Sequence, residues 1–130
     1  MRYSLVLGLA SAASAHFVLQ TPVGIGYDDA KELEGPCGGF SASDRGTVNN
    51  WAVGGDSVGG LTTHPSVTWE FNVALLSDLS FRPLVNPFRQ SAGVGNFCFS
   101  GIRGFEAWVG RDVVLQVIQN APDGRLYQVR

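Results

Sequence analysis

The 130-residue chain contains little charge and few of the residue types that usually carry chemistry. It has two cysteines, two histidines and one methionine, and only 15% of its residues are charged. The formal net charge of -2 at pH 7 argues against a nucleic-acid-binding domain, which would be basic. Low charge together with 45% hydrophobic residues argues against a disordered chain. Length and composition together predict one folded domain.

Further absences narrow the range of functions. Two histidines and no C-x-x-C pair argue against a structural zinc site. The sequence contains no phosphate-binding loop of the P-loop kind and no N-x-S/T site for N-glycosylation. A Ser-His-Asp hydrolase is disfavoured: it would need His64 as its base, because a buried carboxylate could not easily orient a histidine at the amino terminus. Nothing among the 11 acidic residues selects the carboxylate pair that a glycosidase requires.

The first 15 residues are organised like a secretory signal peptide. A positively charged start, Met1–Tyr3, precedes an apolar run over Leu5–Ala13, and Ala13–Ala15 has the small-x-small pattern of a cleavage site. The run is too short for a membrane span, which needs about 20 apolar residues. We therefore predict a signal peptide over residues 1–15 and a secreted domain over residues 16–130. The alternative is that the run forms a buried first strand or a short helix.

Cleavage after Ala15 would make His16 the first residue of the secreted chain. A histidine in that position offers two nitrogens, its α-amine and ring Nδ1, which together close a six-membered chelate around a metal. The reference pKa of an α-amine is about 7.7–8.0, so a metal displaces its proton near neutral pH. Nitrogen donors in a planar arrangement suit Cu(II). The alternative is chance, since some residue must follow every cleavage site.

His64 is the only other histidine, and it lies two residues before a strand predicted to begin near Ser66. Strand alternation places its side chain on the face of Ser66 and Thr68, away from the core, so we expect His64 to be exposed at the rim of the fold. An exposed histidine often has no function. Together with an amino-terminal His16, however, it would supply the three nitrogens of a copper-binding histidine brace.

The two cysteines, Cys37 and Cys98, are predicted to form a disulfide bond. The reason is the compartment: secretion exposes thiols to an oxidising environment, and a pair of cysteines then usually closes one bridge.

Short strands separated by glycine- and proline-containing turns dominate the rest of the chain. The clearest pattern is the alternation of apolar and polar residues from Ser66 to Val73. Residues 27–37 contain four acids and are expected to form a solvated loop and not a second metal site. We predict an all-β fold, an immunoglobulin-like (fibronectin III-like) β-sandwich of about seven strands. The other expected strands are Phe17–Thr21, Asn96–Ser100, Val113–Ile118 and Leu126–Val129.

Five stretches in this order resemble a fungal family of copper acquisition proteins (Bim-type) that are similar to lytic polysaccharide monooxygenases. The stretches are HFVLQTP, GPCGGF, HPSVTWEFNV, GNFCFSG and AWVGRDVVLQVIQNAPDGRLYQ. The resemblance runs from His16 to Gln128. It implies an immunoglobulin-like sandwich that holds one Cu(II) ion, is secreted and acts in copper uptake without oxidative cleavage of polysaccharides. It also implies a glycolipid anchor in many members, although this chain shows no anchor signal.

The ligands that the resemblance implies are His16 with its α-amine, His64, and Asp123 of the PDGRLYQ stretch. The alternative for Asp123 is a purely structural role in the Pro122–Gly124 turn. Family members continue past LYQ with a further cysteine. Two alternatives therefore stay open: Cys37 and Cys98 pair with each other, or one of them lacks its family partner.

Three functions are compatible with these residues. The favoured one is a secreted, non-enzymatic Cu(II)-binding protein for copper acquisition or homeostasis, whose partners would be the copper ion and a copper importer or other cell-surface components. The first alternative is a copper-dependent lytic polysaccharide monooxygenase, which would use the same histidine brace. The second is a structural wall protein that binds no metal.

Overall fold

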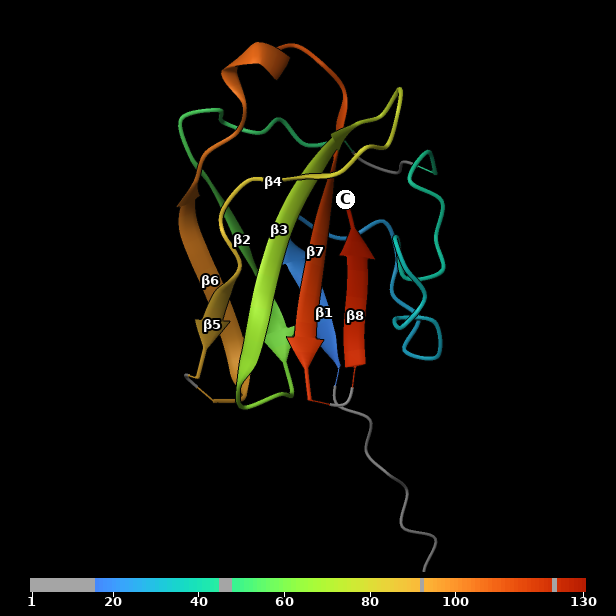
Figure 1. The fold of residues 1–130 in the computed structure, drawn as a ribbon, viewed down its shortest axis with the longest axis vertical. Coiled ribbons are helices and arrows are strands. Elements are labelled where there is room, and N and C mark those ends of the chain that lie inside the picture. Colours follow the sequence, from blue (N-terminus) through green and yellow to red (C-terminus); the bar gives the residue numbers. More distant parts are fainter. Residues whose placement is uncertain (1–15, 45–47, 92, 123) are drawn as a thin grey trace, which may run out of the picture.

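The computed structural model describes residues 16–44, 48–91, 93–122 and 124–130 (Figure 1). The predicted signal peptide and Asp123 therefore lie outside the described residues. Strands are nearly the only regular secondary structure of the described chain, as predicted. Its elements in order are β1 (Phe17–Thr21), β2 (Asp56–Thr62), β3 (Val67–Leu75), β4 (Arg82–Pro83), β5 (Phe88–Gln90), β6 (Gly95–Ile102), the 3-10 helix η1 (Glu106–Trp108), β7 (Val113–Ala121) and β8 (Gly124–Val129).

The strands form two antiparallel sheets that face each other as the layers of a sandwich (Figure 1). One sheet has the order β1-β2-β6, and the other has the order β4-β3-β7-β8 with β5 also paired to β3. The β-sandwich prediction is confirmed. In the described ranges, no helix is long and apolar enough to cross a membrane.

The core lies between the two sheets and is rich in aromatic rings. The predicted alternation of β3 is confirmed, because every second residue from Val67 to Val73 is buried and Trp69 and Phe71 have no exposed surface. The Trp69 ring contacts Phe17 of β1 and Phe97 of β6, with centroids 5.3 and 4.4 Å away, so it joins the two layers. Its Nε1 donates a hydrogen bond of 2.6 Å to Gln90.

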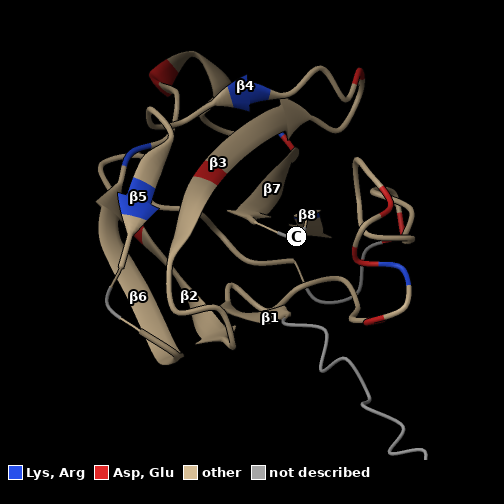
Figure 2. Ribbon diagram, turned by 60° about the horizontal axis from the view of Figure 1, so that its bottom comes forward, with Lys and Arg blue, Asp and Glu red and all other residues tan. Residues whose placement is uncertain are grey.

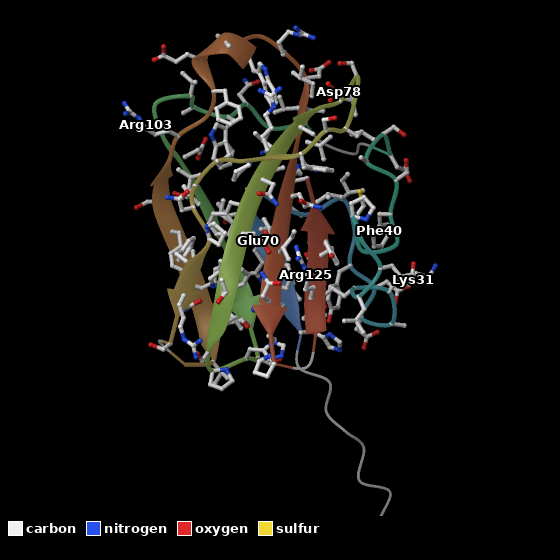
Figure 3. The ribbon with its side chains drawn as sticks, in the orientation of Figure 1. Lys31, Phe40, Glu70, Asp78, Arg103 and Arg125 are labelled. Atoms are coloured by element: carbon white, nitrogen blue, oxygen red, sulfur yellow. The ribbon has the colours of Figure 1, made fainter. Side chains whose placement is uncertain are left out.

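The outer face of the larger sheet carries polar cross-strand contacts instead. Glu70 of β3 accepts hydrogen bonds from Asn120 of β7 and Arg125 of β8, at 2.6 and 3.1 Å. Figure 3 shows Glu70 and Arg125 on this face. The sheet therefore has one apolar and one solvated side, as a sandwich layer requires.

The segment after β1 folds over β8 and builds a second, smaller cluster. Ile25 donates its backbone N–H to Val129 at 2.9 Å, and Tyr127 donates to the carbonyl of Glu32 at 2.8 Å. These bonds fix the position of the acidic loop beside the last strand. The buried members of the second cluster are Cys37, Ala42, Val114 and Val129.

The predicted disulfide is not present in the structure, in which Cys37 and Cys98 are both free thiols. Cys37 is buried against Val114 and Val129, whereas Cys98 is exposed on β6 of the other sheet. Cys37 therefore packs against the larger sheet, whereas Cys98 belongs to the smaller one. Burial raises the pKa of the Cys37 thiol, so this cysteine is a packing residue of low reactivity.

Candidate functional site

The pairing of β1 with β2 brings both histidines to the same end of the sandwich. Phe17 lies opposite Thr62, and the N–H of Thr63 donates to the carbonyl of His16 at 2.9 Å. His64 is the next residue after Thr63, in the short connection to β3. β7 ends and β8 begins at this end as well (Figure 1).

His64 is held in place by a buried hydrogen-bond network. Its Nδ1–H donates to Oε1 of Gln119 on β7 at 2.6 Å, and Nε2 of Gln119 donates to Oγ1 of Thr62 at 2.7 Å. The backbone N–H of His64 also donates to Thr62 Oγ1, at 3.1 Å. An amide oxygen only accepts, so Nδ1 carries the proton, and in the neutral ring Nε2 is the nitrogen with a lone pair for a metal.

The expectation that His64 is exposed was wrong, since its relative exposure is 6%. β3 begins at Val67, one residue after the predicted start, but residues 65 and 66 form a bend. The prediction extended the strand's alternation of side-chain direction back to residue 64, but that alternation does not continue through a bend. His64 turns inward, where Gln119, an entirely buried residue, meets it.

His16 lies at the start of β1, against the buried side chain of Glu32 in the acidic loop. Its Nδ1 is 3.0 Å from Oε2 of Glu32, and its side chain is 17% exposed. Its backbone nitrogen donates to Oγ1 of Thr63 at 2.7 Å. The two nitrogens of the predicted chelate therefore face Glu32 and Thr63.

Glu32 is the exception among the four acids of the loop that was expected to be solvated. The acidic segment lies beside the sandwich, and Lys31 points away from it (Figures 2 and 3), but the Glu32 side chain is only 1% exposed. Burial raises the pKa of its carboxyl group to about 7, and hydrogen bonds from Gln128 and the Phe17 backbone oppose that rise. Nothing in the sequence separates Glu32 from Glu34, because its partners are distant in the chain.

Gln128 on β8 connects this carboxylate to the strand that carries His16. Its Nε2 donates to Oε1 of Glu32 at 2.7 Å and also to the carbonyl of Phe17. Its Oε1 accepts the N–H of Leu19 at 2.9 Å. One buried amide thus fixes the position of β1 relative to β8 and orients Glu32 toward His16.

The structure places His16 and His64 at the same end of the sandwich, each with a partner that the sequence did not predict. His16 contacts Glu32, whereas His64 contacts Gln119, and Asp123 lies outside the described residues. Among the residues that the structure describes, no three His, Cys, Asp or Glu side chains form a cluster that could hold a metal ion. The three-ligand set stays a prediction.

A hydrolase motif in the sequence has no structural support. Gly55 to Gly59 read G-D-S-V-G, which matches the G-x-S-x-G spacing of a nucleophile elbow. Such an elbow requires a turn between a strand and a helix. Ser57 instead lies inside β2, Asp56–Thr62, so the chain shows no nucleophile elbow there.

Comparisons with known proteins point to copper. A family described as copper acquisition factor BIM1-like matches residues 14–128. The chain is also similar to a lytic polysaccharide monooxygenase-like protein of Yarrowia lipolytica, with 30% identity over 132 residues that cover 92% of this chain and 49% of the relative. An uncharacterized protein of Aspergillus fumigatus is 28% identical over 131 residues, which cover 94% of this chain and 54% of that protein. The chain spans about half the length of these curated relatives.

Proposed function

The chain belongs to the copper acquisition factor BIM1-like family, and on that premise we propose that residues 16–130 form a secreted domain that binds one Cu(II) ion. In this proposal residues 1–15 are a signal peptide, and their removal exposes the α-amine of His16. Copper is the cargo of the protein and not the cofactor of a reaction. The domain acts in copper acquisition or homeostasis, and its partners are the ion and a copper importer or other cell-surface components.

The observation that carries the proposal is that the only two histidines lie at one end of the sandwich, His16 hydrogen-bonded to Thr63 and His64 next to Thr63 in the chain. Gln119 accepts the Nδ1 proton of His64, which leaves Nε2 as its metal-binding nitrogen. The α-amine and ring of His16 would supply two further nitrogens. Nitrogen donors of this kind suit Cu(II), the divalent ion with the highest affinity in the first-row series.

The second candidate function is a copper-dependent lytic polysaccharide monooxygenase. The name of the Yarrowia lipolytica relative keeps this candidate open. We favour binding without turnover because the Glu32 carboxylate lies beside His16. An anionic oxygen donor near the metal favours Cu(II) over Cu(I), which prefers soft sulfur ligands, and so opposes the redox cycle of an oxygenase.

The test uses the processed protein, with His16 as its first residue. Calorimetric titration with Cu(II) is expected to give one site per chain. Incubation with copper, a reductant and peroxide over several polysaccharides is expected to yield no oxidised oligosaccharides. A titration without binding heat or saturation would refute the copper proposal, and oxidised products would establish the monooxygenase instead.

Replacing Gln119 by leucine is expected to weaken Cu(II) binding about 10–100-fold. The variant removes the hydrogen-bond acceptor that fixes the His64 ring. It leaves every proposed metal-binding atom in the protein, because Gln119 contacts Nδ1 of His64 and not Nε2. Competition with a chelator of known affinity measures the change.

Gln116→Leu is the matched control, because Gln116 is also a buried glutamine of β7. It hydrogen-bonds Asn72 and the carbonyl of Pro36, not a histidine. Both variants lose buried hydrogen bonds, so similar losses of stability are expected, but only Gln119→Leu should lose copper affinity. Equal affinities of the two variants would show that Gln119 does not position a ligand.

A further inference from the structure

The two oxygens of the Glu32 carboxylate have different surroundings. Oε1 accepts a hydrogen bond of 2.7 Å from Gln128. Oε2 is buried and has no hydrogen-bond partner in the described part of the chain. It lies 3.0 Å from Nδ1 of His16, without the alignment of a hydrogen bond. A buried carboxylate oxygen whose only contact is an ion pair is incompletely satisfied, and this makes it a candidate ligand.

The distance that this ion pair shows also suits two donor atoms of one metal ion. Bonds from a first-row metal to an imidazole nitrogen or a carboxylate oxygen are about 2.0–2.2 Å long. Two such bonds at about 90°, as in tetragonal Cu(II), place the donor atoms about 3 Å apart. Nδ1 of His16 and Oε2 of Glu32 already have this separation.

We propose that Glu32 is a copper ligand, which binds the ion through Oε2 next to the Nδ1 and α-amine of His16. The inference rests on the proposed function, because it names a ligand of the same site. It does not require His64 to move, since His16 and Glu32 supply three donor atoms by themselves. The carboxylate also neutralises part of the charge of a divalent ion in a buried position.

Hydrogen bonds to its backbone and to its side chain fix the position of Glu32. Its backbone carbonyl accepts the N–H of Tyr127, and its Oε1 is fixed by Gln128. The same Gln128 side chain accepts the N–H of Leu19 on β1, the strand that begins next to His16. The distance from Glu32 to His16 is therefore set by one hydrogen-bonded unit, and such preorganisation increases metal affinity.

The experiment labels the glutamate side-chain carboxyl carbons of the processed protein with ¹³C and measures pulsed electron paramagnetic resonance of its Cu(II) form. A strong coupling between copper and one ¹³C nucleus is expected. The coupling should vanish in Glu32→Gln and persist in Glu34→Gln, the control two residues away on the exposed part of the loop. Cu(II) affinity should fall at least about tenfold in Glu32→Gln and stay unchanged in Glu34→Gln.

The outcomes separate this inference from the function on which it rests. Failure of the wild-type protein to bind Cu(II) overturns the proposed function. Binding by the wild type without any ¹³C coupling overturns the ligand role of Glu32, whether or not Glu32→Gln weakens binding. This readout needs only the wild-type protein, so it holds even if the variant does not fold. The same label on aspartate tests Asp123 separately.

Discussion

A form of the protein that keeps one residue before His16, such as an initiator methionine, is expected to bind Cu(II) at least about a hundredfold more weakly than the processed form, a difference of roughly 2.7 kcal/mol. The extra residue converts the α-amine into an amide, whose nitrogen is a poor ligand unless it is deprotonated. The chelate with ring Nδ1 is then lost, and only the side chains of the site remain. Competition between each form and a chelator of known strength measures the two affinities.

The structure supplies the control for this comparison. The His16 nitrogen donates one hydrogen bond to Thr63, and an amide N–H makes that bond as well as an amine does. The two forms should therefore unfold at the same temperature in the absence of copper. Equal Cu(II) affinities for two equally stable forms would show that the amino terminus is not part of the site.

The fold was predictable where strands alternate between core and solvent. β3, β7 and β8 have this pattern or a continuous apolar run, and each was expected close to its observed position. β2 was missed because Gly59 and Gly60 break the pattern. Those glycines are required: a Cβ at Gly60 would lie 2.0 Å from the Val18 carbonyl oxygen, and one at Gly59 would lie 2.8 Å from that of Phe97. The central strand of the smaller sheet thus uses residues that sequence patterns assign to turns.

The site was less predictable than the fold, because the residues that hold its histidines and Glu32 in place are distant from them in the sequence. His16 and His64 are identifiable as the only histidines. Their partners are not: Gln119 is 55 residues from His64, and Gln128 is 96 residues from Glu32. Composition and local spacing contain no information on such pairs. The sandwich brings them together because β7 and β8 of one sheet face β1 and β2 of the other (Figure 1).

Replacing Trp69 by alanine is expected to lower the free energy of unfolding by about 3–5 kcal/mol. The side chain has no exposed surface, and its ring contacts rings from both sheets. Truncation removes these contacts, leaves a cavity between the layers and deprives Gln90 of its donor. Native domains are stable by only about 5–15 kcal/mol, so the loss is a large fraction of the total. Urea unfolding of metal-free protein measures it as a lower midpoint with an unchanged slope.

Trp108→Ala is the control that separates burial from ring contacts. Trp108 also contacts an aromatic ring, Phe105 at 5.1 Å, and the Arg82 guanidinium lies 5.7 Å from its centroid. It lies in η1 at the end of the sandwich, and none of the residues of that helix is buried. Its loss should cost less than about 1 kcal/mol, because little apolar surface is returned to water. Similar losses for Trp108→Ala and Trp69→Ala would mean that Trp69 does not hold the two sheets together. The position of β1, and with it that of His16, would then depend mainly on its pairing with β2 and on Gln128.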